Sequence, residues 1–341
     1  MKCMDAIKES LICHSLKKRS KNRKYTREEA ERYVLPDDAG SEYNNSYYFS
    51  AHDLSGMSLF CRLGQRGGKS ADEVWFAFAD KKNRYNLKQQ LFENDIPLKV
   101  RCLEPGSAWQ VEFTGFLEDA KTKKNVEAAF SGIFRSDEPI FDFSYDMDPR
   151  PMAKTIAKAK WTKAFFKELS ENNQTHYEQG GRLEGTFTIS GVKKKISAPC
   201  IRDHSFGKRS WDYMNMHMWL AALDENGKTI NFSMVSYPAL DEIWVGNTNI
   251  AGGNHKSVIG HEMRTDIRNN NLGQNTVKAI VETADKEKYV ITAERTDVFD
   301  YVFDGGKYHL YEGLGNFTIN GKPARGIIEF GFNDDESRWR K

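Results

Sequence analysis

The stretch IRDHSFGKRSWD, residues 201–212, is the most informative part of the chain. It places two arginines, two aspartates, a histidine and a tryptophan within twelve residues, between segments that have the composition of β-strands. Ionisable groups of both signs beside aromatic rings are costly to desolvate unless they pair with one another. The stretch therefore indicates either a buried polar network that stabilises the fold or a site where pKa values are tuned.

On the N-terminal side of this stretch, short alternating or aromatic-rich runs predict β-strands. The separating segments contain the glycine, proline and aspartate residues that reverse a chain. The predicted strands cover residues 47–52, 57–63, 74–78, 98–103, 109–116 and 126–134. Apolar residues then recur every three or four positions over residues 151–170, which predicts one amphipathic helix.

Strand patterns return after this helix and continue to the end of the chain. They cover residues 181–189, 194–201, 214–223, 229–237, 243–250, 257–267, 276–283, 289–297, 308–317 and 324–332. The turn DENG at residues 224–227 predicts a hairpin between two of them. More than a dozen short strands joined by tight turns predict an all-β protein of two antiparallel barrels or sandwiches with a linking helix.

This organisation gives four expected segments. Residues 1–40 form a basic, partly helical extension, and residues 41–148 form the first β domain. Residues 149–180 form the linking helix, and residues 181–341 form the second β domain with the RDHSFGKRSW segment.

Composition excludes several classes of partner. The 341 residues carry a formal charge of only +2, so the protein as a whole has no field that attracts nucleic acid. The basic run at residues 17–24 is read as solvated surface, and no apolar run approaches the length of a membrane span, so no stable membrane insertion is expected. Five scattered cysteines fit neither a disulfide framework nor a zinc site, which indicates a cytoplasmic location.

The segment Arg202 to Trp211 resembles the R-D-H-S-W-G-x-R-x-W motif of two-domain lipocalin-like proteins of the AttH and carotenoid 1,2-hydratase type. Phe206 replaces the tryptophan of that motif, which keeps an aromatic ring but removes an N–H donor. Stretches around residues 47–66, 176–185 and 311–329 are also similar, so the resemblance covers roughly residues 40–335.

The resemblance implies two consecutive lipocalin-like barrels whose interiors or junction bind lipophilic small molecules. Relatives include an enzyme that adds water to an isoprenoid double bond, and fungal Diels–Alderase cyclases are distantly similar. None of these needs a redox cofactor. The sequence itself lacks a dinucleotide-binding glycine motif, a Walker loop and a histidine-rich ligand spacing, so we expect neither a cofactor nor a metal.

Two interpretations remain open for the polar stretch. Arg202, Asp203, Arg209 and Trp211 can form an arginine–carboxylate network that fixes a corner between strands. Alternatively, Asp203 can orient His204 and make it more basic, which suits a general acid or base.

Other candidates lie on neighbouring strands. His52 shares a strand face with Tyr48, and we expect both to line the interior of the first barrel together with Arg62 and Arg66. Glu329, in an apolar run, and Glu312 are candidates for acids held neutral by burial. The alternative is that these glutamates face solvent or pair with arginines.

The leading hypothesis is a cofactor-independent acid–base enzyme, a hydratase, dehydratase, isomerase or cyclase, that acts on a terpenoid, steroid or polyketide. The catalytic candidates are Asp203, His204 and Glu329, and the substrate-binding candidates are Tyr48, His52, Arg66, Arg202, Arg209, Trp211 and Trp219. The alternative is a non-catalytic carrier or sensor of a hydrophobic ligand. A hydrolase that uses Ser205 or Ser210 is disfavoured because neighbouring strand residues face opposite sides and no G-x-S-x-G elbow is present.

Overall fold

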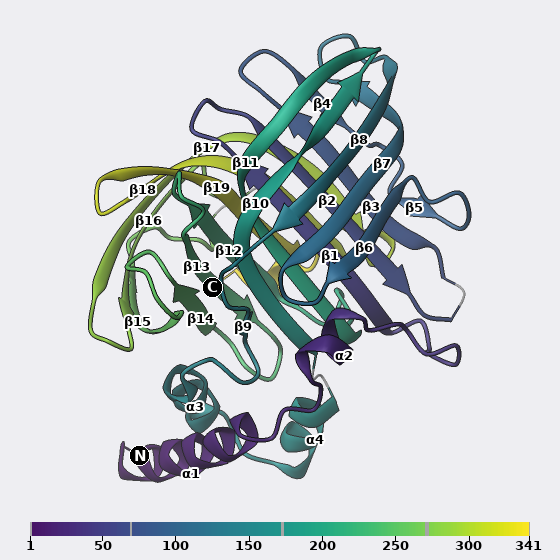
Figure 1. The fold of residues 1–341 in the computed structure, drawn as a ribbon. Helices are drawn as coiled ribbons and strands as arrows, with labels where there is room; N and C mark the ends of the chain where they lie inside the picture. The colour runs from purple at the N-terminus through teal and green to yellow at the C-terminus, as the bar shows by residue number, and fades with distance from the viewer. Residues whose placement is uncertain (1, 69, 172–173, 270–272, 341) are drawn as a thin grey trace.

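The computed structural model describes residues 2–68, 70–171, 174–269 and 273–340. Two antiparallel β units lie side by side, and three helices form a separate layer beneath them (Figure 1). The layer consists of α1 (Lys2–Ser20), α3 (Pro149–Lys158) and α4 (Lys163–Glu171), whereas α2 (Arg27–Glu31) lies at the end of the first unit. Two short 3-10 turns, η1 (Asp304–Gly306) and η2 (Glu336–Arg338), lie near the C-terminus.

The first β unit contains the strands of the N-terminal half. It is built from β1 (Tyr43–His52), β2 (Ser58–Arg66), β3 (Asp72–Ala79), β4 (Arg84–Asn86), β5 (Leu91–Phe92), β6 (Leu98–Glu104), β7 (Ala108–Asp119), β8 (Asn125–Arg135), β9 (Phe141–Asp142), β10 (Thr175–Ile189) and β11 (Val192–Lys208). The order runs β11-β1-β2-β3-β4-β7-β8-β10, and β10 also pairs with β11. This last pairing joins the two ends of the sheet, so the first unit closes into a barrel.

The second β unit is a closed antiparallel barrel in simple sequential order. It consists of β12 (Met216–Leu223), β13 (Thr229–Ser236), β14 (Ile243–Thr248), β15 (Lys256–Met263), β16 (Thr276–Thr283), β17 (Lys288–Phe303), β18 (Tyr308–Ile319) and β19 (Lys322–Asn333). Hydrogen bonds between β12 and β19 complete the ring, and β12 and β13 form the hairpin predicted at residues 224–227.

The predicted all-β class with two antiparallel barrels is confirmed, with two differences in detail. The last strand of the first β unit ends at Lys208, whereas the sequence analysis predicted that the second β domain begins at residue 181. The expected single helix is divided into α3 and α4, because Ala159 takes an extended conformation with ψ of 158°. The Thr162 hydroxyl then accepts a hydrogen bond from the Phe165 N–H and starts the second helix.

Apolar side chains fill both barrels. Alternate residues of β1, β2, β3 and β11 point inward in the first barrel, including Phe49, Cys61 and Phe76. Met218, Phe232 and Phe330 belong to the corresponding core of the second barrel. Both interiors are therefore packed cores.

The helical layer packs on one side of the second barrel. Helix α1 lies against α3, and Ile156 and Phe165 pack with Leu240 and Ile243 at the start of β14. Within the described residues, every helix is too short or too polar to span a membrane.

The interior of the first barrel ends in a buried ion pair. Arg202 and Glu31 are each only 1% exposed, and the Arg202 Nη2 atom donates to both Glu31 oxygens at 2.9 Å. Glu31 also accepts from the Trp109 indole, and the Gln179 side chain accepts from Arg202 Nε. Helix α2 thereby closes this end of the barrel.

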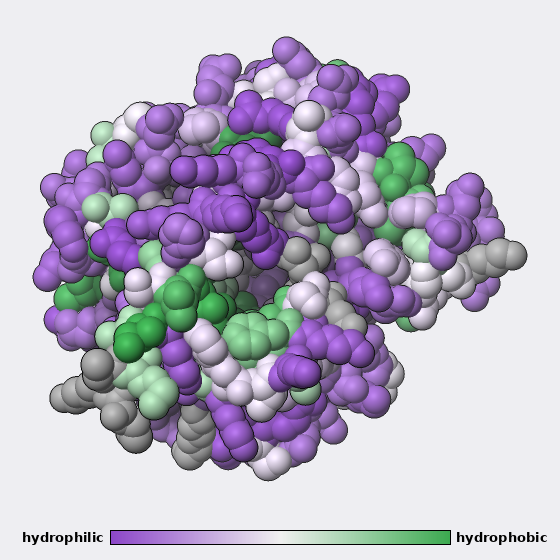
Figure 2. Space-filling model, turned by 90° about the horizontal axis from the view of Figure 1, so that it is seen from below, coloured by the Kyte–Doolittle hydropathy of each residue, from purple (hydrophilic) through white to green (hydrophobic). Residues whose placement is uncertain are grey.

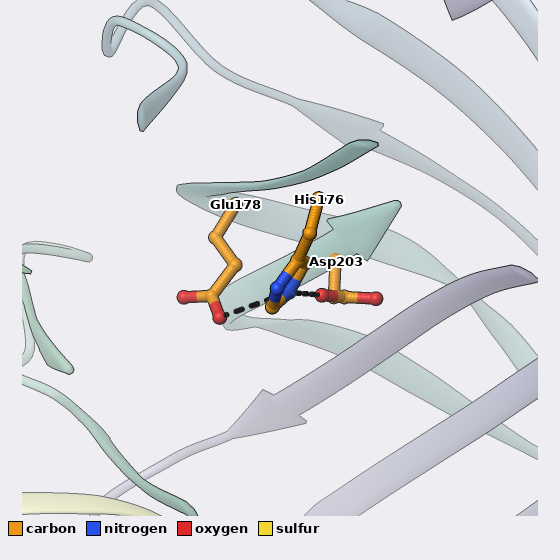
Figure 3. A group of neighbouring side chains, drawn as sticks. All are labelled: His176, Glu178 and Asp203. Carbon is orange, nitrogen blue, oxygen red and sulfur yellow. Dashed lines mark hydrogen bonds and ion pairs between the residues drawn. The ribbon is translucent and has the colours of Figure 1, made fainter. Parts of the chain in front are cut away.

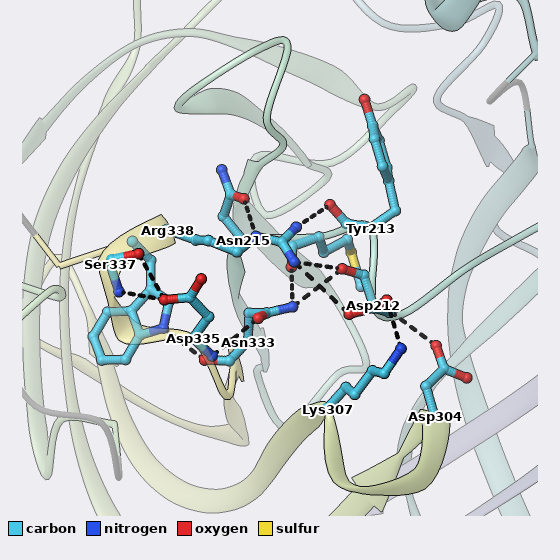
Figure 4. Close-up of polar contacts among 11 residues, drawn as sticks. Asp212, Tyr213, Asn215, Asp304, Lys307, Asn333, Asp335, Ser337 and Arg338 are labelled. Carbon is cyan, nitrogen blue, oxygen red and sulfur yellow. Dashed lines mark hydrogen bonds and ion pairs between the residues drawn. The ribbon is translucent and has the colours of Figure 1, made fainter.

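The connection between the barrels is held by the C-terminus (Figure 4). Arg338 donates to the carbonyl oxygens of Asp212 and Tyr213, both at 2.8 Å, and Asn333 donates to the Asp212 carbonyl at 3.1 Å. Trp339 is 1% exposed and belongs to the core of the second barrel. The last residues thus fix the segment that follows β11.

Glu31→Ala leaves the Arg202 guanidinium buried without its carboxylate, and we expect a loss of about 3–5 kcal/mol in the free energy of unfolding. Urea denaturation measures this loss. Glu28→Ala is the matched control, because the Glu28 side chain is 74% exposed and its pair with Arg32 lies on the surface. Equal stability losses in the two variants would contradict the structural role assigned to Glu31.

Candidate active site at the barrel junction

The outer faces of the two barrels meet in a buried contact, which we call the junction. It is formed by residues of β1–β3 and β11 on one side and of β12 and β17–β19 on the other. Trp75 stacks on Tyr301 with ring centroids 4.1 Å apart, and Phe60 packs edge-on against Phe299 at 5.0 Å. Between these aromatic rings the junction buries an unusual number of ionisable side chains.

Two carboxyl groups face each other in the junction. Glu312 of β18 and Glu329 of β19 are directly opposite in the strand register and are 0% and 7% exposed. The Tyr48 hydroxyl donates to Glu312 at 2.5 Å. His217 Nε2 lies 2.6 Å from Glu329, and His217 Nδ1 lies 2.6 Å from the Tyr308 hydroxyl. The pair thus has a tyrosine on one side and a histidine on the other.

The two carboxyl groups have opposite pKa shifts. Burial and the neighbouring Glu329 raise the pKa of Glu312 well above its ordinary value. Burial also tends to raise the pKa of Glu329, but the contact with His217, the hydrogen bond with Glu312 and the charge of Arg209 together outweigh it and lower that pKa. Of the two, Glu312 therefore holds its proton more strongly and Glu329 loses its proton more readily, an arrangement that separates a proton donor from a proton acceptor.

The hydrogen-bond partners of His217 determine how its imidazole ring is oriented. Burial raises the pKa of Tyr308 well above its ordinary value, so this phenol keeps its proton and can donate to His217 Nδ1. Nε2–H then donates to the Glu329 carboxylate. Gly331 lies opposite His217 in the register, and a Cβ at this position would collide with the imidazole. The glycine leaves the space that the ring occupies.

A second group of polar residues in the junction carries excess positive charge. Arg62 and Arg66 both bind Glu73, at 2.7 and 2.6 Å, and Arg209 lies 3.9 Å from the Trp211 ring centroid. Burial tends to raise the pKa of Glu73, but the two guanidinium groups outweigh it and lower that pKa. Burial and the neighbouring cations lower the pKa of Arg209 to about 10. Two of these three guanidinium groups thus bind the same carboxylate, that of Glu73.

Several donors in this arginine group lack an acceptor within the described protein. Arg62 Nη2, Trp75 Nε1 and Trp211 Nε1 are buried without a hydrogen-bond partner. Arg62 lies 4.9 Å from the Trp75 ring and 6.0 Å from the Trp211 ring, so the three side chains are neighbours. An unsatisfied buried donor costs about 1–3 kcal/mol, so a concentration of them favours binding of an acceptor-rich group.

A third group lies at the edge of the junction on β10 and β11 (Figure 3). His176 contacts Asp203 and lies 3.5 Å from Glu178, and the side chains are 39%, 13% and 4% exposed in that order. Burial tends to lower the pKa of His176, but the two carboxyl groups outweigh it and raise that pKa. Burial raises the pKa of Glu178 to about 8.

Their possible ligand atoms lie within 4.8 Å of one another, a spacing that suits a divalent cation. However, the unpartnered Glu178 Oε2 points away from the histidine in Figure 3, and the raised pKa favours a neutral carboxyl group. The three side chains thus offer both an acid–base group and three ligand atoms for a cation.

The structure separates Asp203 from His204, contrary to the expected pair. Successive residues of β11 point to opposite faces, so Asp203 faces the junction and His204 faces the interior of the first barrel. His204 is 0% exposed, lies 2.8 Å from the Asn45 side chain and contacts the Tyr177 hydroxyl at 2.5 Å. Burial lowers the pKa of His204 well below its ordinary value.

The same alternation moves Tyr48 and His52 out of the barrel interior where we expected them. Both lie on the outer face of β1, in the junction. His52 is held between Ser50 and Ser58 at 2.7 and 2.9 Å, and burial lowers its pKa to about 3. It is a neutral histidine whose ring nitrogens are both occupied.

The remaining predicted residues fall into two places. Arg66, Arg209 and Trp211 lie in the arginine group, and Trp219 packs edge-on against Tyr48 at 5.4 Å. Arg202 lies elsewhere, in the buried pair with Glu31. Sequence reasoning missed His217, Tyr308, Glu73 and His176 as site residues. The isolated position of His217 on a strand carried no signal, and only the register pairs it with Glu329.

A small pocket of about 40 Å³ lies outside the junction, at the end of the first barrel covered by α2. Glu31, Ile140 and Tyr177 are among its lining residues. Its volume holds a water molecule or two, so it is too small for a lipophilic substrate.

Glu178→Gln should reduce the pH dependence of stability. A carboxyl group whose pKa rises from its ordinary 4.5 to about 8 on folding binds more protons in the folded state, so it makes stability fall between these pH values. We expect the Tm of the unmodified protein to decrease more between pH 5 and 8 than that of the variant. Parallel Tm curves for the two proteins would show that Glu178 is ionised throughout.

Comparison with known structures supports the fold. A putative AttH from Nitrosomonas europaea has a TM-score of 0.55 at 10% identity, covering 87% of this chain and 95% of the other. Kievitone hydratase from Nectria haematococca has a TM-score of 0.53 at 11% identity, covering 93% and 98%. CghA has a TM-score of 0.51 at 8% identity, covering 88% and 94%. The predicted resemblance to AttH-type proteins is therefore confirmed at the level of fold.

No curated protein matches the sequence. A family model described as a domain of unknown function, DUF7064, matches residues 28–334, which include both barrels. The chain therefore belongs to the DUF7064 family.

Proposed function

We propose that the protein is an acid–base enzyme that hydrates, dehydrates or cyclises a lipophilic small molecule at the junction. The observation that carries the proposal is the buried Glu312–Glu329 pair, in which two carboxyl groups with oppositely shifted pKa values lie opposite each other and His217 contacts one of them. A buried carboxyl group with a raised pKa is suited to protonate an alkene or an enol near neutral pH. Kievitone hydratase, by its name a hydratase, has the same fold.

The junction is favoured over the barrel interiors because of its chemistry. It places the Glu312–Glu329 pair and unpartnered N–H donors beside aromatic rings, whereas the cores of both barrels are formed by apolar side chains. Its edge includes the 39% exposed side chain of His176 and the partly exposed Trp219. Because Glu312 is 0% exposed, a substrate reaches this proton donor when side chains at the edge of the junction move apart.

In the proposed hydration, the Glu312 carboxyl group delivers its proton to one carbon of the double bond. Water adds to the resulting cationic carbon and loses a proton to Glu329, which His217 holds in place. Transfer of this proton from Glu329 to Glu312 restores the starting state, and dehydration follows the same steps in reverse. For a cyclisation, a carbon–carbon bond replaces the addition of water and the same two groups move the protons.

In the proposed reaction, the arginine group orients the substrate. The unpartnered N–H groups of Arg62, Trp75 and Trp211 favour a substrate with an acidic or strongly hydrogen-bond-accepting group, such as a carboxylate, an enolate or a phenolate. The aromatic rings of the junction exclude bulk water from the cationic carbon. Of the earlier catalytic candidates, Glu329 keeps that role, Asp203 acts with His176 at the edge, and His204 is assigned to holding the fold.

The experiment is incubation of the purified protein with a pooled extract of lipids, steroids and isoprenoids, followed by mass spectrometry of the products. We expect one member of the pool to gain or lose one water, or to change retention without a change of mass. Glu312→Gln and Glu329→Gln should each lower turnover by about 100-fold or more, because each removes one proton-transfer group.

Glu294→Gln is the matched control, since Glu294 is an exposed glutamate of the same barrel. Turnover that survives both junction substitutions would remove the glutamate pair from the mechanism. Retention of one compound without chemical change, by the unmodified protein and the variants alike, would instead establish a carrier.

A further inference from the structure

Helix α1 is apolar on two faces, and α3 covers only one of them. Ile12 and Leu16 are partly buried on the side of α1 that packs on α3. Met4, Ile7 and Leu11 are 64%, 57% and 59% exposed. Positions spaced by three and four residues share one stripe of a helix, so these three side chains form a continuous exposed line.

The layer formed by α1, α3 and α4 has a large positive net charge. Residues 2–20 and 149–171, which include α1, α3 and α4, contain eleven lysines and arginines but four aspartates and glutamates, a formal charge of +7. The whole chain carries +2, so the rest of the molecule carries −5. The net charge of the protein is therefore small, although positive charge is concentrated in the helical layer and negative charge in the rest of the molecule.

The charged and apolar side chains lie together on the surface. Lys17 and Lys18 are exposed at the end of α1, and Lys18 continues the stripe of Ile7 and Leu11. Phe166 of α4 is 38% exposed. Figure 2 views the molecule from this side and shows a group of hydrophobic residues bordered by hydrophilic ones. We call the exposed side of α1, α3 and α4 the helical surface.

We propose that the helical surface binds the face of a membrane that contains anionic lipids. The lysines and arginines attract the lipid headgroups, each contributing on the order of 1 kcal/mol of attraction near such a surface. Met4, Ile7 and Leu11 then enter the boundary between headgroups and acyl chains, and α1 lies in the plane of the membrane. The inference goes beyond the proposed function and does not depend on it, since it concerns a different side of the molecule.

A lipid surface fits these observations better than a nucleic acid. Nucleic-acid binding uses the cations but gains nothing from a line of exposed aliphatic side chains. A membrane uses both features. Large exposed apolar side chains rimmed by charge are typical of interaction surfaces rather than of bare solvent-facing helices.

The test is co-sedimentation of the full chain with vesicles of pure phosphatidylcholine or of phosphatidylcholine mixed with phosphatidylglycerol. We expect binding to the mixed vesicles that is at least about tenfold tighter than to the neutral ones and that weakens as salt is raised. Lys17→Glu/Lys18→Glu should lower the affinity about tenfold or more. Ile7→Ser/Leu11→Ser should lower it several-fold with the charge unchanged.

A matched control variant, Val192→Ser/Lys193→Glu/Lys195→Glu, alters exposed residues of the hairpin between β10 and β11, at the other end of the molecule (Figure 1). It should bind as the unmodified protein does, and circular dichroism verifies that every variant keeps its secondary structure. Equal binding to neutral and anionic vesicles, or an equal loss in the control variant, overturns the proposal. Tighter binding to a single-stranded RNA than to the mixed vesicles, unaffected by Ile7→Ser/Leu11→Ser, overturns it in favour of a nucleic-acid surface.

Discussion

The alternation of side chains along β1 and β11 is the constraint on which the rest of the structure depends. One face of each strand completes the core of the first barrel, while the other faces the second barrel. Because of this alternation, the Phe49 side chain lies in the core of the first barrel, whereas the neighbouring Tyr48 side chain contacts Glu312 of the second barrel. Because both barrels use their outer faces to pack against each other, the Glu312–Glu329 pair and the arginine group lie between the barrels.

Burial at the junction explains the chemistry that the site can perform. Two carboxyl groups in one desolvated place cannot both be ionised at low cost, and the histidine beside Glu329 decides which of them keeps the charge. The arginine group lies in the same contact but is partly satisfied by Glu73. Two carboxyl groups with oppositely shifted pKa values beside a set of unpartnered donors support the proposed acid–base role.

The sequence predicted the fold and part of the site because those features depend on local patterns. Strand alternation and turn residues identified the barrels, and the apolar surroundings of Glu312 and Glu329 identified them as candidate acids. The interpretation of the RDHSFGKRSW segment was wrong in one respect, because the strand pleat separates Asp203 from His204. The partner of Arg202 is Glu31, 171 positions away, and the partner of Glu329 is His217, 112 positions away. Such pairs depend on strand register and on where α2 packs, and neither can be read from a short motif.

The central claim is that Glu312 is protonated at neutral pH while Glu329 is ionised. The most direct measurement is the infrared difference spectrum, in the carboxylic-acid C=O region at pH 7, between the unmodified protein and Glu312→Gln. The account predicts a carboxylic-acid band in the unmodified protein that is lost in the variant, while the contribution of Glu178 cancels. A spectrum in which Glu312→Gln removes a carboxylate band instead would show that Glu312 is ionised and would contradict the proposed division of roles.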